Sequence, residues 1–180
     1  MEISRRAVRR VIEAQITTVL FTATVFSQGA YANTVHVCAT CAHKTIQSAV
    51  NDAASGDTVA VAAGRYLENI TAQGKSLTIQ GAGSSTTSVV AAGRGPVFTL
   101  GSGAAGDANY LITIQGLTIS GGYHDSGTGI GGGVQVRAGS YLHLANSSVV
   151  GNFAKIGGGG VGIQTAASAP QTTIDRKSVV

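Results

Sequence analysis

The chain has 180 residues, of which 26 are glycine and 2 are proline, and charged residues make up 11%. This composition excludes a highly charged disordered tract and a collagen-like protein. Lysine and arginine number 12 and aspartate and glutamate 8, but four of these bases and two of these acids lie in the first 32 residues. The remaining bases are scattered and have no interleaved aromatic residues, which excludes a nucleic-acid-binding groove. One domain is expected at this length.

Residues 1–32 have the pattern of an export signal. A basic segment over residues 5–10 precedes an apolar run over residues 16–26, and Ala30-Tyr31-Ala32 matches a cleavage site. We therefore predict a signal peptide and a secreted, periplasmic or cell-surface protein. The paired arginines leave the route open between general and twin-arginine export. A retained N-terminal amphipathic helix is the alternative, because Glu13 lies between the basic and apolar segments.

Cys38 and Cys41 are the only cysteines. In an exported chain they predict a disulfide, which closes a short loop and so stabilises the fold little. A catalytic redox role would place the pair at the start of a helix in a βαβ unit, and haem attachment would require histidine in place of Ala42. A zinc site with His36 and His43 is a further alternative, although its Cys-to-His spacings are short.

One segment after the leader, residues 45–54, has a helical period. Gly56 lies just beyond it and ends the pattern. Its apolar residues fall on one face: Ile46, Ala49, Val50 and Ala53.

Short apolar strands separated by glycine- or serine-rich turns follow the helix. We predict strands over residues 58–62, 77–80, 97–100, 111–115, 117–120, 134–136, 141–144 and 161–163. In these segments apolar residues alternate with polar ones, as in Leu77-Thr78-Ile79, which is typical of half-buried strands. TIQG at 78–81 returns at 113–116, and GGGV at 131–134 returns at 158–161. Matching strands with loops of unequal length predict a solenoid, with an antiparallel sandwich or barrel as the alternative.

Five early segments carry a family resemblance: KTIQSAV (44–50), SGDTV (55–59), AGRY (63–66), ENI (68–70) and LTIQGAG (77–83). Together they resemble the start of right-handed parallel β-helix proteins of the pectin-lyase-like superfamily. The later glycine-rich repeats are similar to those of polymorphic outer-membrane and adhesin-type surface proteins: GGGV (131–134), YLHL (141–144), NSSV (146–149), GN (151–152) and GGGV (158–161).

The resemblance implies an all-β fold, a right-handed parallel β-helix over residues 45–163 that begins with a short cap helix. An N-terminal segment with the cysteine pair, 33–44, precedes it, and an irregular tail, 164–180, follows. About four to five coils fit this length, and nothing amphipathic in the tail covers the last one. We therefore expect a fragment of a longer coil, or end-to-end self-association of its open end. An incomplete gene product is a third possibility.

Enzymes of this superfamily use acidic calcium ligands with a basic residue, or clustered carboxylates. The acids after the leader are isolated in sequence: Asp52, Asp57, Glu68, Asp107, Asp125 and Asp175. The first two belong to the helix and the turn after it and the last to the tail, which leaves Glu68, Asp107 and Asp125. Their spacing predicts no carboxylate pair, so no catalytic residue is assigned.

The candidate ligand-binding residues are Tyr123, His124 and Asp125 in a glycine-rich loop, with Arg137 on the next strand. A solvated loop tip is the alternative. Our leading hypothesis is an exported, non-catalytic surface or secreted β-helix for adhesion or contact with a polysaccharide or cell-surface glycan, without cofactor, metal, nucleic acid or transmembrane helix. The alternative is a polysaccharide lyase or glycoside hydrolase, in which calcium would be required by the lyase.

Overall fold

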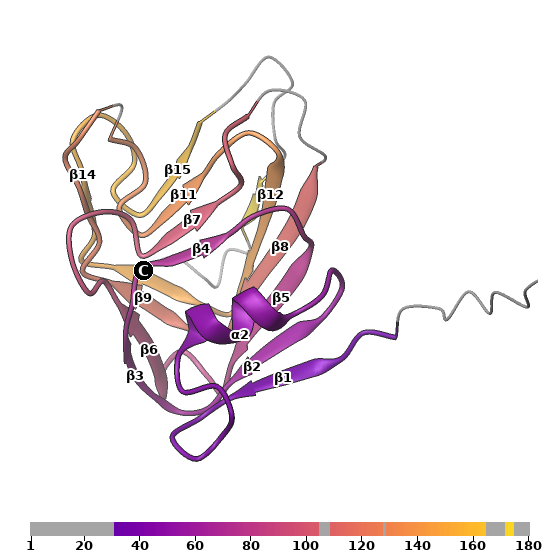
Figure 1. The fold of residues 1–180 in the computed structure, drawn as a ribbon. Helices are drawn as coiled ribbons and strands as arrows, with labels where there is room; N and C mark the ends of the chain where they lie inside the picture. The colour runs from indigo at the N-terminus through magenta and orange to yellow at the C-terminus, as the bar shows by residue number, and fades with distance from the viewer. Residues whose placement is uncertain (1–30, 105–108, 128, 165–171, 175–180) are drawn as a thin grey trace, which may run out of the picture. The chain divides into compact units, whose positions relative to one another are not determined.

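The regular structure consists almost entirely of short parallel strands (Figure 1). The computed structural model describes residues 31–104, 109–127, 129–164 and 172–174, all within one unit, Tyr31–Val180. Every pair of named strands in these ranges is parallel. This pairing excludes the antiparallel sandwich and confirms an all-β fold with parallel sheets. The predicted signal peptide falls on residues 1–30, outside the described part.

The strands form three sheets, named here A, B and C. Sheet A contains β1 (Thr34–Val37), β2 (Thr58–Val61), β5 (Leu77–Gly81), β8 (Tyr110–Gln115), β12 (Ser140–Ala145) and β16 (Thr172–Ile174). Sheet B contains β3 (Gly64–Leu67), β6 (Thr87–Val90), β9 (Thr118–Ser120) and β13 (Ser148–Val150). Sheet C contains β4 (Ile70–Ala72), β7 (Phe98–Leu100), β11 (Val134–Val136) and β15 (Val161–Ile163). Two further short strands, β10 (Tyr123–His124) and β14 (Phe153–Ala154), pair with each other.

The chain visits the three sheets in a fixed rotation. It passes from A to B to C, then returns to A beside the strand it left. We call each circuit a rung: rung 1 is β2–β4, rung 2 is β5–β7, rung 3 is β8–β11 and rung 4 is β12–β15. Each strand therefore finds its hydrogen-bond partners one circuit away in sequence, which satisfies its backbone groups.

Inward-facing residues of successive rungs are register partners. Val59, Ile79, Ile114 and Leu144 form one such row on sheet A, and none has measurable exposure. Equivalent rows from sheets B and C belong to the same apolar cluster. Each fully buried Ile or Leu contributes about 1.5–3 kcal/mol, so the alternation seen in the sequence supplies the core.

Helix α2 (Ile46–Asp52; Figure 1) contacts β1, β2 and β4, and its buried residues belong to the apolar core. It is shorter than the predicted segment 45–54 because Thr45 is its N-cap and Ala53 its C-cap. Both ends are held by the connections that follow β3 and β4. The Glu68 carboxylate accepts hydrogen bonds from the backbone N–H groups of Ile46 (2.8 Å) and Gln47 (2.9 Å).

At the other end of α2, the Lys75 ammonium donates to the carbonyl oxygens of Val50 (2.9 Å), Asn51 (3.0 Å) and Ala53 (2.7 Å). An acid at the first turn and a base at the last complement the helix dipole and satisfy backbone groups that a helix leaves free. A helix of seven residues is not stable alone in water, so these contacts and the buried face hold it.

All eight predicted strands are present, with ends shifted by at most one residue. The tail that was expected to be irregular contains β16, which pairs with β12. Within the described residues, no helix is both long and apolar enough to cross a membrane.

Candidate functional site

Two of the acidic residues considered for chemistry have structural roles instead. Asp57 is buried, and its two carboxylate oxygens accept hydrogen bonds from the N–H groups of Asn33 and Ala54, each at 2.8 Å. Glu68 binds the first turn of α2 with both oxygens. Each carboxylate thus satisfies two backbone donors, which stabilises the fold near β1 and α2.

The other acids do not form a cluster in the part of the chain that is described. Asp52 lies 3.7 Å from His43, and Asp125 pairs with Arg94 at 2.7 Å. Asp107 and Asp175 lie outside the described residues. Among the residues with described positions, no group of three or more His, Cys, Asp or Glu side chains is placed to hold a metal ion.

The structure places two aromatic rings and a guanidinium in contact on three successive rungs. The Tyr123 and Phe153 rings stack with centroids 4.8 Å apart and an interplanar angle of 19°. The Arg94 guanidinium carbon lies 5.4 Å from the centroid of the Tyr123 ring. We call Arg94, Tyr123 and Phe153 the aromatic column. Its two rings are 42% and 46% exposed, so the column is a surface feature and not part of the core.

The column is built by the connections from sheet B to sheet C. These span residues 68–69, 91–97, 121–133 and 151–160 in the four rungs, and they are the places where β10 and β14 form. Gly95 and Tyr123 exchange backbone hydrogen bonds of 2.8 and 3.0 Å, and β10 pairs with β14 in parallel. The connections of rungs 3 and 4 therefore pair in parallel like the strands, and an antiparallel bridge joins those of rungs 2 and 3. This pairing brings the side chains of the connections together.

The glycines of these loops allow the close stacking. A Cβ atom at Gly122 would overlap the carbonyl oxygen of Gly132, and one at Gly132 would overlap that of Phe153. Glycine is thus required by the approach of one backbone to the next. A side chain at either glycine would push the two connections apart and so separate Tyr123 from Phe153.

Of the predicted site residues, Tyr123 is part of this column, and His124 and Asp125 follow it directly in the chain. The Asp125 carboxylate accepts the hydrogen bond from Arg94, and His124 Nδ1 lies 2.9 Å from the carbonyl oxygen of Ile130. Because a carbonyl oxygen only accepts, Nδ1 donates here and the ring is held in one orientation. The Arg94 side chain of this ion pair is exposed, and the pair contributes little to stability. A ligand can therefore reach the polar atoms of the pair, and their engagement costs the fold little.

Arg137 does not belong to this group. It follows β11, whereas the loop with Tyr123 precedes that strand. Its backbone N–H donates to Leu100 (2.8 Å), and its guanidinium lies beside Gly103. Within the described ranges no hydrogen bond or ion pair joins it to Tyr123, His124 or Asp125. The described contacts of Arg137 therefore lie with the residues around Leu100 and Gly103.

No family model, curated protein or solved structure matches the chain. The function must therefore be inferred from the geometry of its surface.

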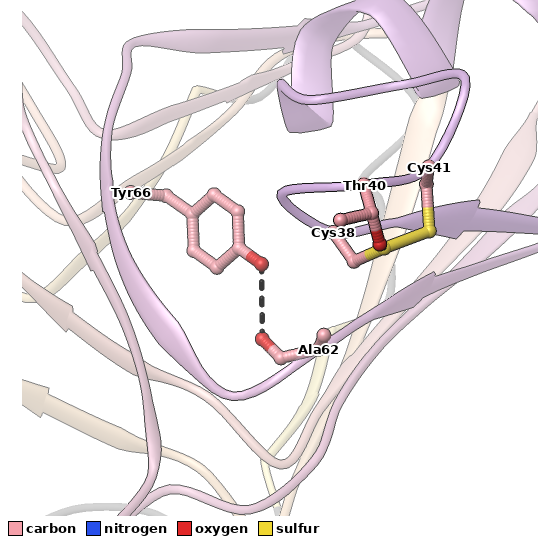
Figure 2. The surroundings of a disulfide bond; sticks show 5 residues. All are labelled: Cys38, Thr40, Cys41, Ala62 and Tyr66. Carbon is pink, nitrogen blue, oxygen red and sulfur yellow. Dashed lines mark hydrogen bonds between the residues drawn. A yellow bond between two sulfur atoms is a disulfide. The ribbon is translucent and has the colours of Figure 1, made fainter.

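The predicted disulfide is confirmed. Cys38 and Cys41 are bonded, with Cα atoms 5.0 Å apart, in the turn between β1 and α2 (Figure 2). The zinc alternative is wrong, because both sulfur atoms are used in the disulfide and are not free thiolates.

A concave site of about 620 Å³ lies beside the disulfide, on the outward face of the first strands of sheet A. We call it the sheet A groove. Its lining contains no Lys, Arg, Asp or Glu: it is formed by Thr34, His36, Val37, Cys38, Cys41, Thr58, Ala60, Val61, Ala62, Gln80, Gly81 and Ala82.

Arg94 and Phe153 were missed as site residues. Arg94 lies one rung before Tyr123, and Phe153 lies one rung after it. No local sequence motif therefore joins the three residues. An alignment of the rungs would have found them, since residues at almost equal offsets, 94, 123 and 153, occupy the same connection.

Proposed function

We propose that this chain is an exported, non-catalytic right-handed parallel β-helix that contacts glycans through the aromatic column. The β-helix part of the proposal is supported by the rotation through sheets A, B and C and by the rows of buried register partners. The resemblance of residues 44–83 to the pectin-lyase-like superfamily supports the same fold. The role at the cell surface or in secreted material follows from the signal-peptide pattern.

The observation that carries glycan contact is the exposed stack of Tyr123 and Phe153 with Arg94 and Asp125 beside it. An aromatic face packs against the apolar C–H face of a sugar ring, while charged side chains at its edge exchange hydrogen bonds with hydroxyl groups. The two large rings, 42% and 46% exposed, leave apolar surface in contact with water. A ligand that covers the two rings would remove this apolar surface from water, which supports a binding role for the column.

The partners of the described acids favour a binding role over catalysis. Asp57 and Glu68 are occupied with backbone donors, and Asp125 with Arg94. A two-carboxylate mechanism needs a pair of carboxyl groups with free oxygens about 5–10 Å apart. We therefore expect no unsaturated product when the full chain is incubated with polygalacturonate and calcium. Steady formation of such a product, followed by ultraviolet absorbance, would overturn the non-catalytic proposal.

Glycan contact is tested on a printed array of neutral and uronate-containing oligosaccharides. We expect the full chain to bind at least one of them and Phe153→Ala to weaken that binding about tenfold, because a stacking contact of about 1.4 kcal/mol is lost. Leu111→Ala is the matched control, since Leu111 is 48% exposed but lies on β8, away from the column. Equal losses for both variants, or no binding to the array, would contradict the proposal.

Self-association is proposed through rung 4, which carries three exposed apolar side chains. Val150 on β13, Ile163 on β15 and Ile156 between them are 36%, 40% and 66% exposed. If these side chains meet a second copy, sedimentation will show a concentration-dependent dimer that Ile156→Lys with Ile163→Lys abolishes. A monomer at every concentration would refute this part.

A further inference from the structure

The disulfide is partly exposed and forms one wall of the sheet A groove. Cys38 and Cys41 both line this concave site, and both are partly exposed. A small molecule that enters the groove would therefore lie beside the two disulfide-bonded residues.

The backbone around the disulfide is held by its own hydrogen bonds. The Cys41 N–H donates to the carbonyl of Cys38 (3.3 Å), and the Cys38 N–H donates to that of His43 (3.2 Å). The disulfide joins residues only three apart in sequence. A crosslink that closes so short a loop removes little entropy from the unfolded chain, so breaking it costs the fold little. Exposed disulfides that stabilise weakly are the ones that exchange with thiols.

The surroundings of the two sulfur atoms differ. Thr40 Oγ1 lies 3.5 Å from Cys38 Sγ (Figure 2). A hydroxyl in that position donates to a thiolate and stabilises it. Cys38 is therefore the better leaving group and Cys41 the sulfur that is attacked, because a leaving thiolate of lower energy departs faster.

We propose that Cys38–Cys41 is a thiol–disulfide exchange site for a low-molecular-weight thiol that enters through the sheet A groove. The thiolate of the first molecule forms a bond to Cys41 Sγ, the Cys38–Cys41 bond breaks, and Cys38 leaves with the electron pair. The thiolate of a second molecule then attacks the small-molecule sulfur atom of the mixed disulfide. The bond to Cys41 breaks, and Cys41 leaves with the electron pair. Two thiols are oxidised to one disulfide, and the protein gains two electrons and two protons. The proposal does not rest on glycan binding.

Exchange does not require a helix N-terminus at the cysteines, and none is present there. Helix α2 begins at Ile46, beyond the turn. Its anchors, Glu68 and Lys75, are independent of the disulfide. Reduction should therefore loosen the turn and β1, the edge strand of sheet A, while α2 stays in place.

The first test measures reduction of the folded full chain by reduced glutathione, with free thiols trapped by alkylation and counted by mass. We expect two alkyl groups per chain without denaturant. Thr40→Val should slow the reaction about fivefold, the effect of one lost hydrogen bond of about 1 kcal/mol. Thr34→Val is the matched control, because Thr34 lines the same groove, whereas the hydroxyl beside Cys38 Sγ belongs to Thr40. Alkylation that occurs only in denaturant, or equal slowing by both variants, would overturn the proposal.

The second test is independent of the reaction rate. Hydrogen exchange is compared between the oxidised full chain and the variant with both Cys38→Ser and Cys41→Ser. The Ala62 N–H donates to the carbonyl of Val37 at 2.9 Å across β1 and β2, so its protection should fall at least fivefold when the turn loosens, while that of the Ala53 N–H, which donates to Ala49 at the end of α2, should not change. Unchanged protection at Ala62 would contradict the expected release of β1.

Discussion

Glu68→Ala removes the acceptor for the first two backbone N–H groups of α2. The carboxylate accepts from Ile46 at 2.8 Å and from Gln47 at 2.9 Å. A hydrogen bond to a charged group contributes about 1.5–3 kcal/mol, and a negative charge at a helix N-terminus about 0.3–1 kcal/mol. Because Glu68 is only half-buried, water replaces part of the loss. We expect the free energy of unfolding to fall by about 2–3 kcal/mol for Glu68→Ala and about 1 kcal/mol for Glu68→Gln, which keeps one acceptor oxygen.

The assay is urea unfolding followed by far-ultraviolet circular dichroism, with hydrogen exchange at Ile46 and Gln47 as the local readout. Asp52→Asn is the matched control, because this acid lies at the other end of α2 and its side chain is 69% exposed. We expect it to change stability by less than about 0.5 kcal/mol. The reasoning would be refuted if Asp52→Asn cost as much as Glu68→Ala, or if Glu68→Ala left the exchange of Ile46 and Gln47 unchanged.

Three further predictions follow from the same structure. Ile114→Ala in the core should destabilise by about 2–5 kcal/mol, whereas Leu111→Ala on the same strand should cost less than about 1 kcal/mol; equal unfolding midpoints in urea would contradict this. Lys75→Met removes three hydrogen bonds to the end of α2 and should lower the urea midpoint, an effect that Lys155→Met should not share. Burial and, secondly, the Glu68 carboxylate raise the pKa of Tyr66 above its ordinary 10.0, so the folded state holds this proton more tightly and the contribution is present below about pH 10 and lost as the pH rises above it; Tyr66→Phe should flatten that loss in unfolding curves measured between about pH 9 and 11.

Much of sheet A could be predicted from the sequence, because its strands alternate cleanly between apolar and polar residues. Leu77-Thr78-Ile79 and Leu142-His143-Leu144 both have buried outer residues and a partly exposed central one. Eight strands were not predicted: β1, β3, β4, β6, β10, β13, β14 and β16. Strand β3 contains Arg65 and pairs with only one neighbour, at the edge of sheet B, so tertiary pairing and not local pattern makes it a strand.

The candidate site was predicted less completely, since contacts between rungs have no local signature. Tyr123, His124 and Asp125 are adjacent in sequence and were found as a group. Their partners Arg94 and Phe153 are about 30 residues away in either direction, and only the register of the stacked connections brings them close. Glu68 was considered for chemistry because it lies outside the helix, the turn after it and the tail, but its contact with the first turn of α2 has no signature in the local sequence.

The connections from sheet B to sheet C differ widely in length, from residues 68–69 in rung 1 to residues 121–133 in rung 3, yet the strands on either side keep their register. Connections of different length at this corner are therefore compatible with the same strand register. Foreign peptides inserted at successive connections would project from one line at the strand spacing of about 4.8 Å. The molecule is accordingly suited to use as a display scaffold, in which epitopes are arrayed at fixed intervals without redesign of the interior.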